Sequence, residues 1–138
     1  MADLSITAIA AIEEPGTLIQ DRTSTESFAV GQPMYLNTSQ YSLADGTDTD
    51  KLEVVGITIV AGSTGDYPVM VTNGARISLT GPTLTKGLAY YLSGSGTAGK
   101  IAPYADLGTG DSVVQLGIAS TTAILDVKIV IPSPAITL

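Results

Sequence analysis

The feature that most restricts the fold of this chain is the short spacing of its chain-breaking residues. Segments rich in Val, Ile, Thr and Tyr alternate with Gly, Pro, Asn and Asp from end to end. No window of about eleven residues keeps a helical period of apolar residues without interruption. This pattern is typical of an all-β protein. Because 138 residues can bury one core without disulfides, we expect a single β-domain with little helix.

Alternating apolar and polar residues predict individual strands. The clearest strand is expected at 123–131, where Asp126 and Lys128 would point to solvent from between apolar residues. We expect a β-hairpin at 69–79, because Asn73-Gly74 suits the positive φ values of a type I′ turn. Further strands are expected at 33–37, 52–60, 88–93 and 113–119.

The sequence also contains an internal repeat. The matching pieces are 31–36 with 87–92, then 44–45 with 105–106, and 55–57 with 116–118. The offset between the copies grows from 56 to 61 residues, and we place the five extra residues in the stretch 94–100. We therefore expect a small barrel or sandwich built from two β pseudo-repeats, at about 31–60 and 87–119.

The repeat divides the chain into three parts. Residues 25–131 form the expected β-domain, and 132–138 a carboxy-terminal tail. Residues 1–24 are either an arm that orders on a neighbouring protein or an extra strand of the domain, with a turn at 13–16 between two pieces. The apolar residues of this segment are Leu4, Ile6, Ile9, Ile12, Leu18 and Ile19.

Composition argues against several classes of function. The chain has no cysteine and no histidine, which removes thiol nucleophiles, Ser-His-Asp triads and the common zinc sites. Six scattered basic residues against thirteen acidic ones give a net charge of −7, which disfavours nucleic acid and anionic membranes as partners. Asp3 stands where a signal peptide would carry a basic residue, and no apolar run approaches about 20 residues. We expect a soluble protein.

The stretch 94–101, Gly-Ser-Gly-Thr-Ala-Gly-Lys-Ile, fits the first seven positions of a phosphate-binding loop. Ile101 stands where that loop needs Ser or Thr to help hold magnesium, and Pro103 and Gly108 prevent a helix from following. A flexible hairpin tip between two strands is therefore the favoured interpretation.

Two groups of carboxylates are further candidate sites. Residues 44–50 carry Asp45, Asp48 and Asp50, but the spacing does not fit a calcium loop, so a solvated turn with Asp side chains capping backbone amides is favoured. The pair Asp45 and Asp106 could perform acid–base chemistry, but the repeat makes them equivalent turn residues rather than facing partners. We therefore assign no catalytic, cofactor-binding or metal-binding residue.

Aromatic residues offer one more candidate surface. Tyr90-Tyr91, with Tyr104 nearby in sequence, could stack against a sugar. Adjacent strand residues face opposite sides, so we expect one of the pair in the core and the other exposed.

Structural glycines, turns and strand cores recur in six segments within about residues 25–131. These segments are 31–36, 54–57, 87–93, 101–107, 110–111 and 115–119. Together they resemble the capsid cement, or head-decoration, proteins of tailed phages.

The resemblance implies a small β-rich virion protein that is not an enzyme. Such proteins assemble in the host cytoplasm onto the outer surface of the expanded phage head, often as homotrimers, and reinforce contacts between subunits of the major capsid protein. The alternative is a β-rich adhesion or glycan-binding module on the phage head or tail.

Overall fold

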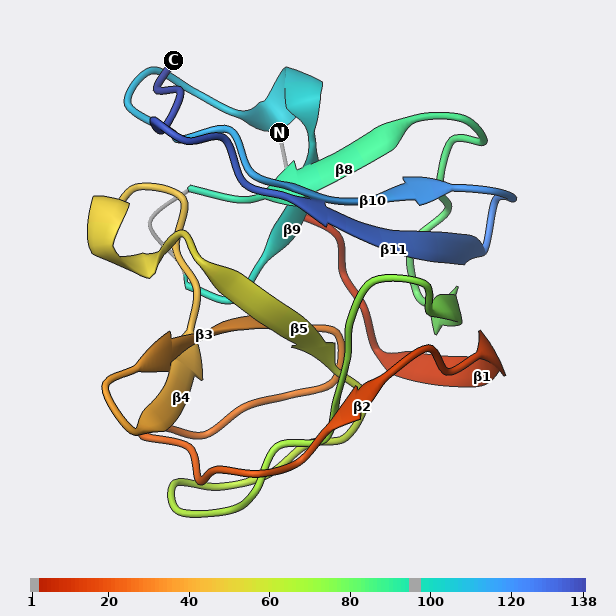
Figure 1. Cartoon of the computed structure of the whole chain (residues 1–138). Coiled ribbons are helices and arrows are strands. Elements are labelled where there is room, and N and C mark those ends of the chain that lie inside the picture. Colours follow the sequence, from red (N-terminus) through yellow and green to blue (C-terminus); the bar gives the residue numbers. More distant parts are fainter. Residues whose placement is uncertain (1–2, 95–97) are drawn as a thin grey trace.

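The chain folds into two antiparallel β-sheets packed face to face. The computed structural model describes residues 3–94 and 98–138. The all-β expectation is confirmed, and of the two expected architectures the structure has the sandwich, with two separate open sheets. In Figure 1, strands β8 to β11 (cyan to blue) lie together in the upper part and β3 to β5 (orange to yellow) in the lower part.

The five-stranded sheet has the order β2-β6-β5-β3-β4. Its strands are β2 (Leu18–Ile19), β3 (Pro33–Asn37), β4 (Gln40–Leu43), β5 (Val54–Thr58) and β6 (Met70–Val71). The six-stranded sheet has the order β1-β7-β11-β10-β8-β9. Its strands are β1 (Ala8–Glu14), β7 (Arg76–Thr80), β8 (Ala89–Leu92), β9 (Ile101–Pro103), β10 (Gln115–Ala119) and β11 (Ile124–Val130). Short 3₁₀ turns, η1 (Thr49–Lys51) and η2 (Tyr104–Asp106), follow β4 and β9.

The main hydrophobic core lies between the two sheets. Ile57 and Val71 enter it from the five-stranded sheet, and Leu92, Leu116 and Leu125 enter it from the six-stranded sheet. A second, smaller cluster of Phe28, Met34, Tyr41 and Met70 lies apart from the main core. Because Met34 and Tyr35 are consecutive in β3 and belong to different clusters, the second cluster lies on the outer face of the five-stranded sheet.

The predicted hairpin at 69–79 is wrong. The chain does turn there, since Ala75 N donates to Thr72 O at 3.2 Å, but β6 and β7 belong to different sheets. Gly74 has a φ of 92°, whereas Thr38 is the sole non-glycine with positive φ among the described residues. A type I′ turn needs positive φ at both central residues. Because Gly74 has a positive φ and Asn73 does not, the turn is not of type I′. The chain passes through it from one sheet to the other.

A bent ribbon of two antiparallel strands connects the sheets. β1 pairs with β7, from Ala8 opposite Thr80 to Glu14 opposite Arg76. Beyond Pro15 and Gly16 the pairing continues in the other sheet, with Leu18 opposite Val71. Residues 8–19 therefore form edge strands of both sheets, which corresponds to the extra-strand alternative for the amino-terminal segment.

The two sheets share one topology. Adding five to each strand number turns the order β2-β6-β5-β3-β4 into β7-β11-β10-β8-β9, so each sheet is one copy of a five-stranded unit. The pairs Pro33–Ile57, Met34–Gly56 and Tyr35–Val54 of the first copy recur as Ala89–Ile118, Tyr90–Gly117 and Tyr91–Gln115 in the second. Both ladders shift register at the same step. The similarity thus reaches beyond 31–60 and 87–119.

The structure also relocates one of the extra residues of the second copy. The offset between copies is 56 at β3 and β8, becomes 60 at β4 and β9, and reaches 61 at β5 and β10. Four of the five extra residues therefore lie in the β8–β9 connection, and one lies between β9 and β10. The expectation that all five fall in 94–100 is wrong by that one residue.

The repeated glycines Gly56 and Gly117 are required by close packing within each sheet. A Cβ on Gly56 would lie 2.7 Å from Val71 O, and one on Gly117 would lie 2.5 Å from Asp126 O. These carbonyl groups occupy equivalent positions on β6 and β11, since Val71 pairs with Ile57 and Asp126 pairs with Ile118. Both copies have the same close approach between adjacent strands.

We therefore expect Gly56→Ala and Gly117→Ala each to destabilise the protein by about 1–3 kcal/mol, because the added methyl group overlaps the neighbouring backbone. Urea unfolding measures the change. Gly108→Ala is the matched control, since its Cβ would lie 3.9 Å from Asp111 Oδ2, an ordinary contact distance. Equal stability of all three variants would contradict the packing argument.

Candidate functional site

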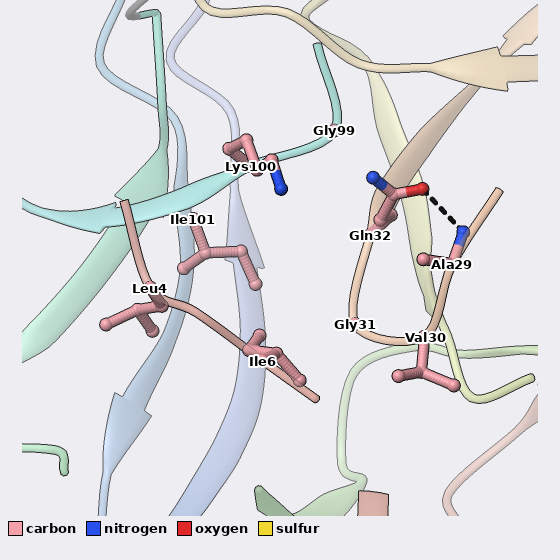
Figure 2. Close-up of a pocket in the computed structure, with 9 residues that line it drawn as sticks. All are labelled: Leu4, Ile6, Ala29, Val30, Gly31, Gln32, Gly99, Lys100 and Ile101. Carbon is pink, nitrogen blue, oxygen red and sulfur yellow. Dashed lines mark hydrogen bonds between the residues drawn. The ribbon is translucent and has the colours of Figure 1, made fainter. Parts of the chain in front are cut away.

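A small pocket lies at the seam between the two sheets (Figure 2). It is bounded by Leu4 and Ile6, by the segment 29–32 that leads into β3, and by 99–101 at the start of β9. Within the segment 29–32, the Oε1 of Gln32 accepts a hydrogen bond from Ala29 N at 2.8 Å. The volume is about 40 Å³, which accommodates a few water molecules but not an organic ligand of cofactor size.

The amino-terminal segment closes this seam. Leu4 N donates to Ile101 O at 2.8 Å, and Thr7 N donates to Thr80 O at 2.9 Å, so residues 4–7 span from β9 to β7. Leu4, Ile6 and Ile9 pack against the main core. Ile6 lies directly on Gly31, where a Cβ would be 2.8 Å from its Cδ1. The apolar residues assigned to an arm by sequence thus belong in part to the core of their own chain.

The stretch that resembles a phosphate-binding loop connects two paired strands. Residues 95–97 lie outside the described part of the chain. On either side, Ser93 N donates to Lys100 O at 2.9 Å and Leu92 pairs with Ile101. Ile101 begins strand β9 rather than a helix. The expected hairpin between β8 and β9 is confirmed.

The acidic turn at 44–50 uses its carboxylates as backbone caps. Asp45 Oδ1 accepts from Thr47 N at 2.9 Å, and Asp48 Oδ1 accepts from Asp50 N at 3.0 Å at the start of η1. Lys51 lies 3.7 Å from the other oxygen of Asp48. The predicted capping by Asp side chains is confirmed. Among the described residues, no group of three or more acidic side chains is arranged to hold a metal ion.

The two carboxylates considered for acid–base chemistry lie on different elements. Asp45 follows β4, and Asp106 ends η2. Because β4 and β9 are related by an offset of 60, the position equivalent to Asp45 is Ala105, so the sequence match of the pair is one residue out of structural register. Asp106 Oδ2 is buried and accepts no hydrogen bond from the described residues.

The tyrosines divide between core and surface as expected. Tyr90 is 3% exposed, and its hydroxyl oxygen accepts from Thr85 N at 2.9 Å. Tyr91 faces outward, where its ring meets Tyr104 edge to face with 5.6 Å between ring centroids. Tyr104 remains 50% exposed. In an edge-to-face pair the edge of one ring lies against a face of the other, so that face is not free to stack on a sugar. The pair is therefore a limited surface for stacking.

Sequence reasoning missed the segment 20–30, which covers the outer face of the five-stranded sheet. Phe28 packs on Gly62 with reciprocal backbone hydrogen bonds of 2.9 Å. Tyr41 OH donates to Asp21 Oδ1 at 2.6 Å, which attaches the start of the segment to β4. Burial and this hydrogen bond raise the pKa of Tyr41 to about 12. The one signal in the sequence was that Phe28 is its only phenylalanine.

No family model matches the chain, and no curated protein matches it. In the described part of the chain, no helix is long and apolar enough to cross a membrane.

We expect Ile6→Ala to lower the free energy of unfolding by about 1–3 kcal/mol, because it removes apolar contacts at the seam. Thermal unfolding measures this change. Ile136→Ala, at a side chain 54% exposed, should change stability by less than about 0.5 kcal/mol. An Ile6 variant as stable as the Ile136 variant would contradict the stabilising role of Ile6 at the seam.

Alkaline titration tests the contact between Tyr41 and Asp21. The tyrosine hydroxyl ionises near 10.0 in the unfolded chain and about 12 in the folded protein, so its stabilising contribution is complete below pH 10 and disappears as the pH rises through 12. Tyrosinate absorbance should show a step near pH 12 that Tyr41→Phe removes and Tyr104→Phe retains. A step retained in Tyr41→Phe would contradict the assignment.

Proposed function

We propose that the chain is a structural virion protein that decorates the outer surface of an expanded phage head and stabilises contacts between major capsid subunits. The observation that carries this proposal is the resemblance of 31–36, 54–57, 87–93, 101–107, 110–111 and 115–119 to capsid cement proteins. These segments contribute to β3 and β5 of the five-stranded sheet and to β8, β9 and β10 of the six-stranded sheet. The resemblance therefore concerns the framework of the whole fold.

The physical properties of the chain support such a role. A cement protein needs a stable body and complementary surfaces rather than a deep pocket, and the pocket here holds about 40 Å³. Assembly as a homotrimer would link several modest contacts, each strengthened by the effective concentration that the others create. The net charge of −7 would limit sticking between decorated particles. The proposal assigns no catalytic residue, cofactor or nucleic-acid partner.

Of the amino-terminal segment, the edge of β1 is the part available to contact a neighbouring protein. The outer edges of β4 and β9 are covered by their own chain, since Thr25 N donates to Tyr41 O at 2.9 Å and Leu4 N to Ile101 O at 2.8 Å. In the described sheets β1 ends the six-stranded order, and Ile12 on it is 39% exposed. Exposed strand edges readily pair with other chains. We propose that the edge of β1 contacts the shell or a sister subunit.

Cosedimentation with undecorated capsids tests the proposal. The purified protein is mixed with compact precursor shells and with expanded shells of its source phage. We expect saturable binding to expanded shells alone, with higher resistance of those shells to heat. Absence of binding to either shell would contradict the cement function, and a glycan screen would then address the adhesion alternative.

A matched pair of variants locates the contact in the same experiment. Ile12→Lys alters the edge of β1, whereas Val60→Lys makes the same change of chemistry in the loop after β5, at a residue 41% exposed. We expect Ile12→Lys to weaken shell binding at least about tenfold while Val60→Lys binds as the unaltered protein does. Equal binding by the two variants would exclude the β1 edge while leaving the cement function in place.

A further inference from the structure

The two copies of the repeat pack with unlike faces in contact, so the same side of each copy points in the same direction. In the five-stranded sheet, Tyr35, Val54, Ile57 and Val71 face the main core. Their equivalents in the six-stranded sheet are Tyr91, Gln115, Ile118 and Asp126, by strand pairing. None of these four belongs to a core cluster. We call this side of the repeat the Tyr35 face.

The opposite side of the repeat, the Met34 face, shows the converse arrangement. In the five-stranded sheet Met34 and Met70 lie in the outer cluster. Their equivalents in the six-stranded sheet, Tyr90 and Leu125, lie in the main core. The Tyr35 face of the first copy therefore packs on the Met34 face of the second.

Packing of this kind is open-ended, because each copy keeps one unused face. Repeat proteins end such stacks with units whose outer face is covered or polar. The first copy ends the stack with its own chain, since the segment 20–30 places Phe28 over Met34 and Met70. On the second copy, the ring of Tyr104 in η2 meets Tyr91 of the Tyr35 face edge to face. The connection between β7 and β8 instead packs its Leu84 into the main core.

The second copy instead carries different residues on the exposed Tyr35 face. The apolar pair Leu18 and Val71, opposite each other in β2 and β6, becomes Arg76 and Asp126, opposite each other in β7 and β11. Arg76 Nε lies 3.0 Å from Asp126 Oδ1, and that hydrogen bond raises the arginine pKa. Gln115 stands in place of Val54.

These substitutions oppose burial of the face. Covering an ion pair removes both charges from water, and the attraction between them does not reliably repay that cost. Tyr91 and Ile118, which keep the residue types of Tyr35 and Ile57, leave the rest of the face suited to packing. The face is a repeat packing surface on which three polar residues replace the apolar ones.

We propose that Arg76, Gln115 and Asp126 are the residues that prevent this face from packing against the same face of a second copy of the chain. The same face is the expected occupant because the Met34 face of every copy is already covered. This inference is independent of the proposed capsid function.

Restoring the residues of the first copy tests the proposal. The variant Arg76→Leu, Gln115→Val, Asp126→Val receives the amino acids found at Leu18, Val54 and Val71. We expect sedimentation velocity to show a concentration-dependent doubling of the mass of the assembly relative to the unaltered protein. A variant with native circular dichroism and unchanged mass would overturn the proposal.

A matched control separates specific packing from added hydrophobicity. Lys86→Leu, Gln20→Val, Asp50→Val makes similar changes at three exposed residues outside the face, and its mass should not change. Association of the control to the same degree would also overturn the proposal.

Two double variants keep the test decisive if the triple variant unfolds. Arg76→Leu with Asp126→Val retains Gln115 and should still associate. Arg76→Asp with Asp126→Arg restores an ion pair of opposite order and should not associate. Equal masses of the two double variants would contradict the role of the charges.

Discussion

The fold depends on the corner at which two paired strands pass together from one sheet to the other. Gly16 lies against the turn 72–75, and a Cβ there would be 2.9 Å from Ala75 N. Gly74 N donates to Val127 O at 3.1 Å, and Asn73 Oδ1 accepts from Ile129 N at 2.6 Å, which attach the corner to β11. Because both chain segments bend at this corner, β1 stays paired with β7 in one sheet and β2 with β6 in the other. The core lies between the two sheets.

The internal repeat explains how a chain with little aromatic content builds this core. Each copy supplies a sheet with one apolar face toward the other copy, so a single five-stranded pattern used twice buries both. The copies also differ where the stack ends. Segment 20–30 covers one end, while Arg76 and Asp126 keep the other in water. These two differences between the halves therefore follow from the positions of the copies in the stack.

The same logic shows how far residue patterns can be taken. The strand at 33–37 matches β3, and the alternation at 123–131 matches β11, because one face of each is buried and period-two alternation records that burial. Asn73-Gly74 correctly predicted a turn, but not the sheet to which the following strand belongs. Turn chemistry fixes local φ values, whereas the sheet that receives the next strand depends on distant partners, here β1 and β11.

For the candidate sites, local chemistry was readable and long-range assembly was not. The sequence by itself determined the all-β class, the Asp caps of 44–50, the hairpin around Lys100 and the burial of one residue of the pair Tyr90-Tyr91 with the other facing outward, since each depends on residues close together in the chain. Only the tertiary structure decided that Ile6 packs on Gly31, that Tyr41 bonds Asp21, and that the two copies stack in one direction. These contacts join residues about 20 or more positions apart, and no local pattern specifies which distant surface satisfies a given apolar or polar group.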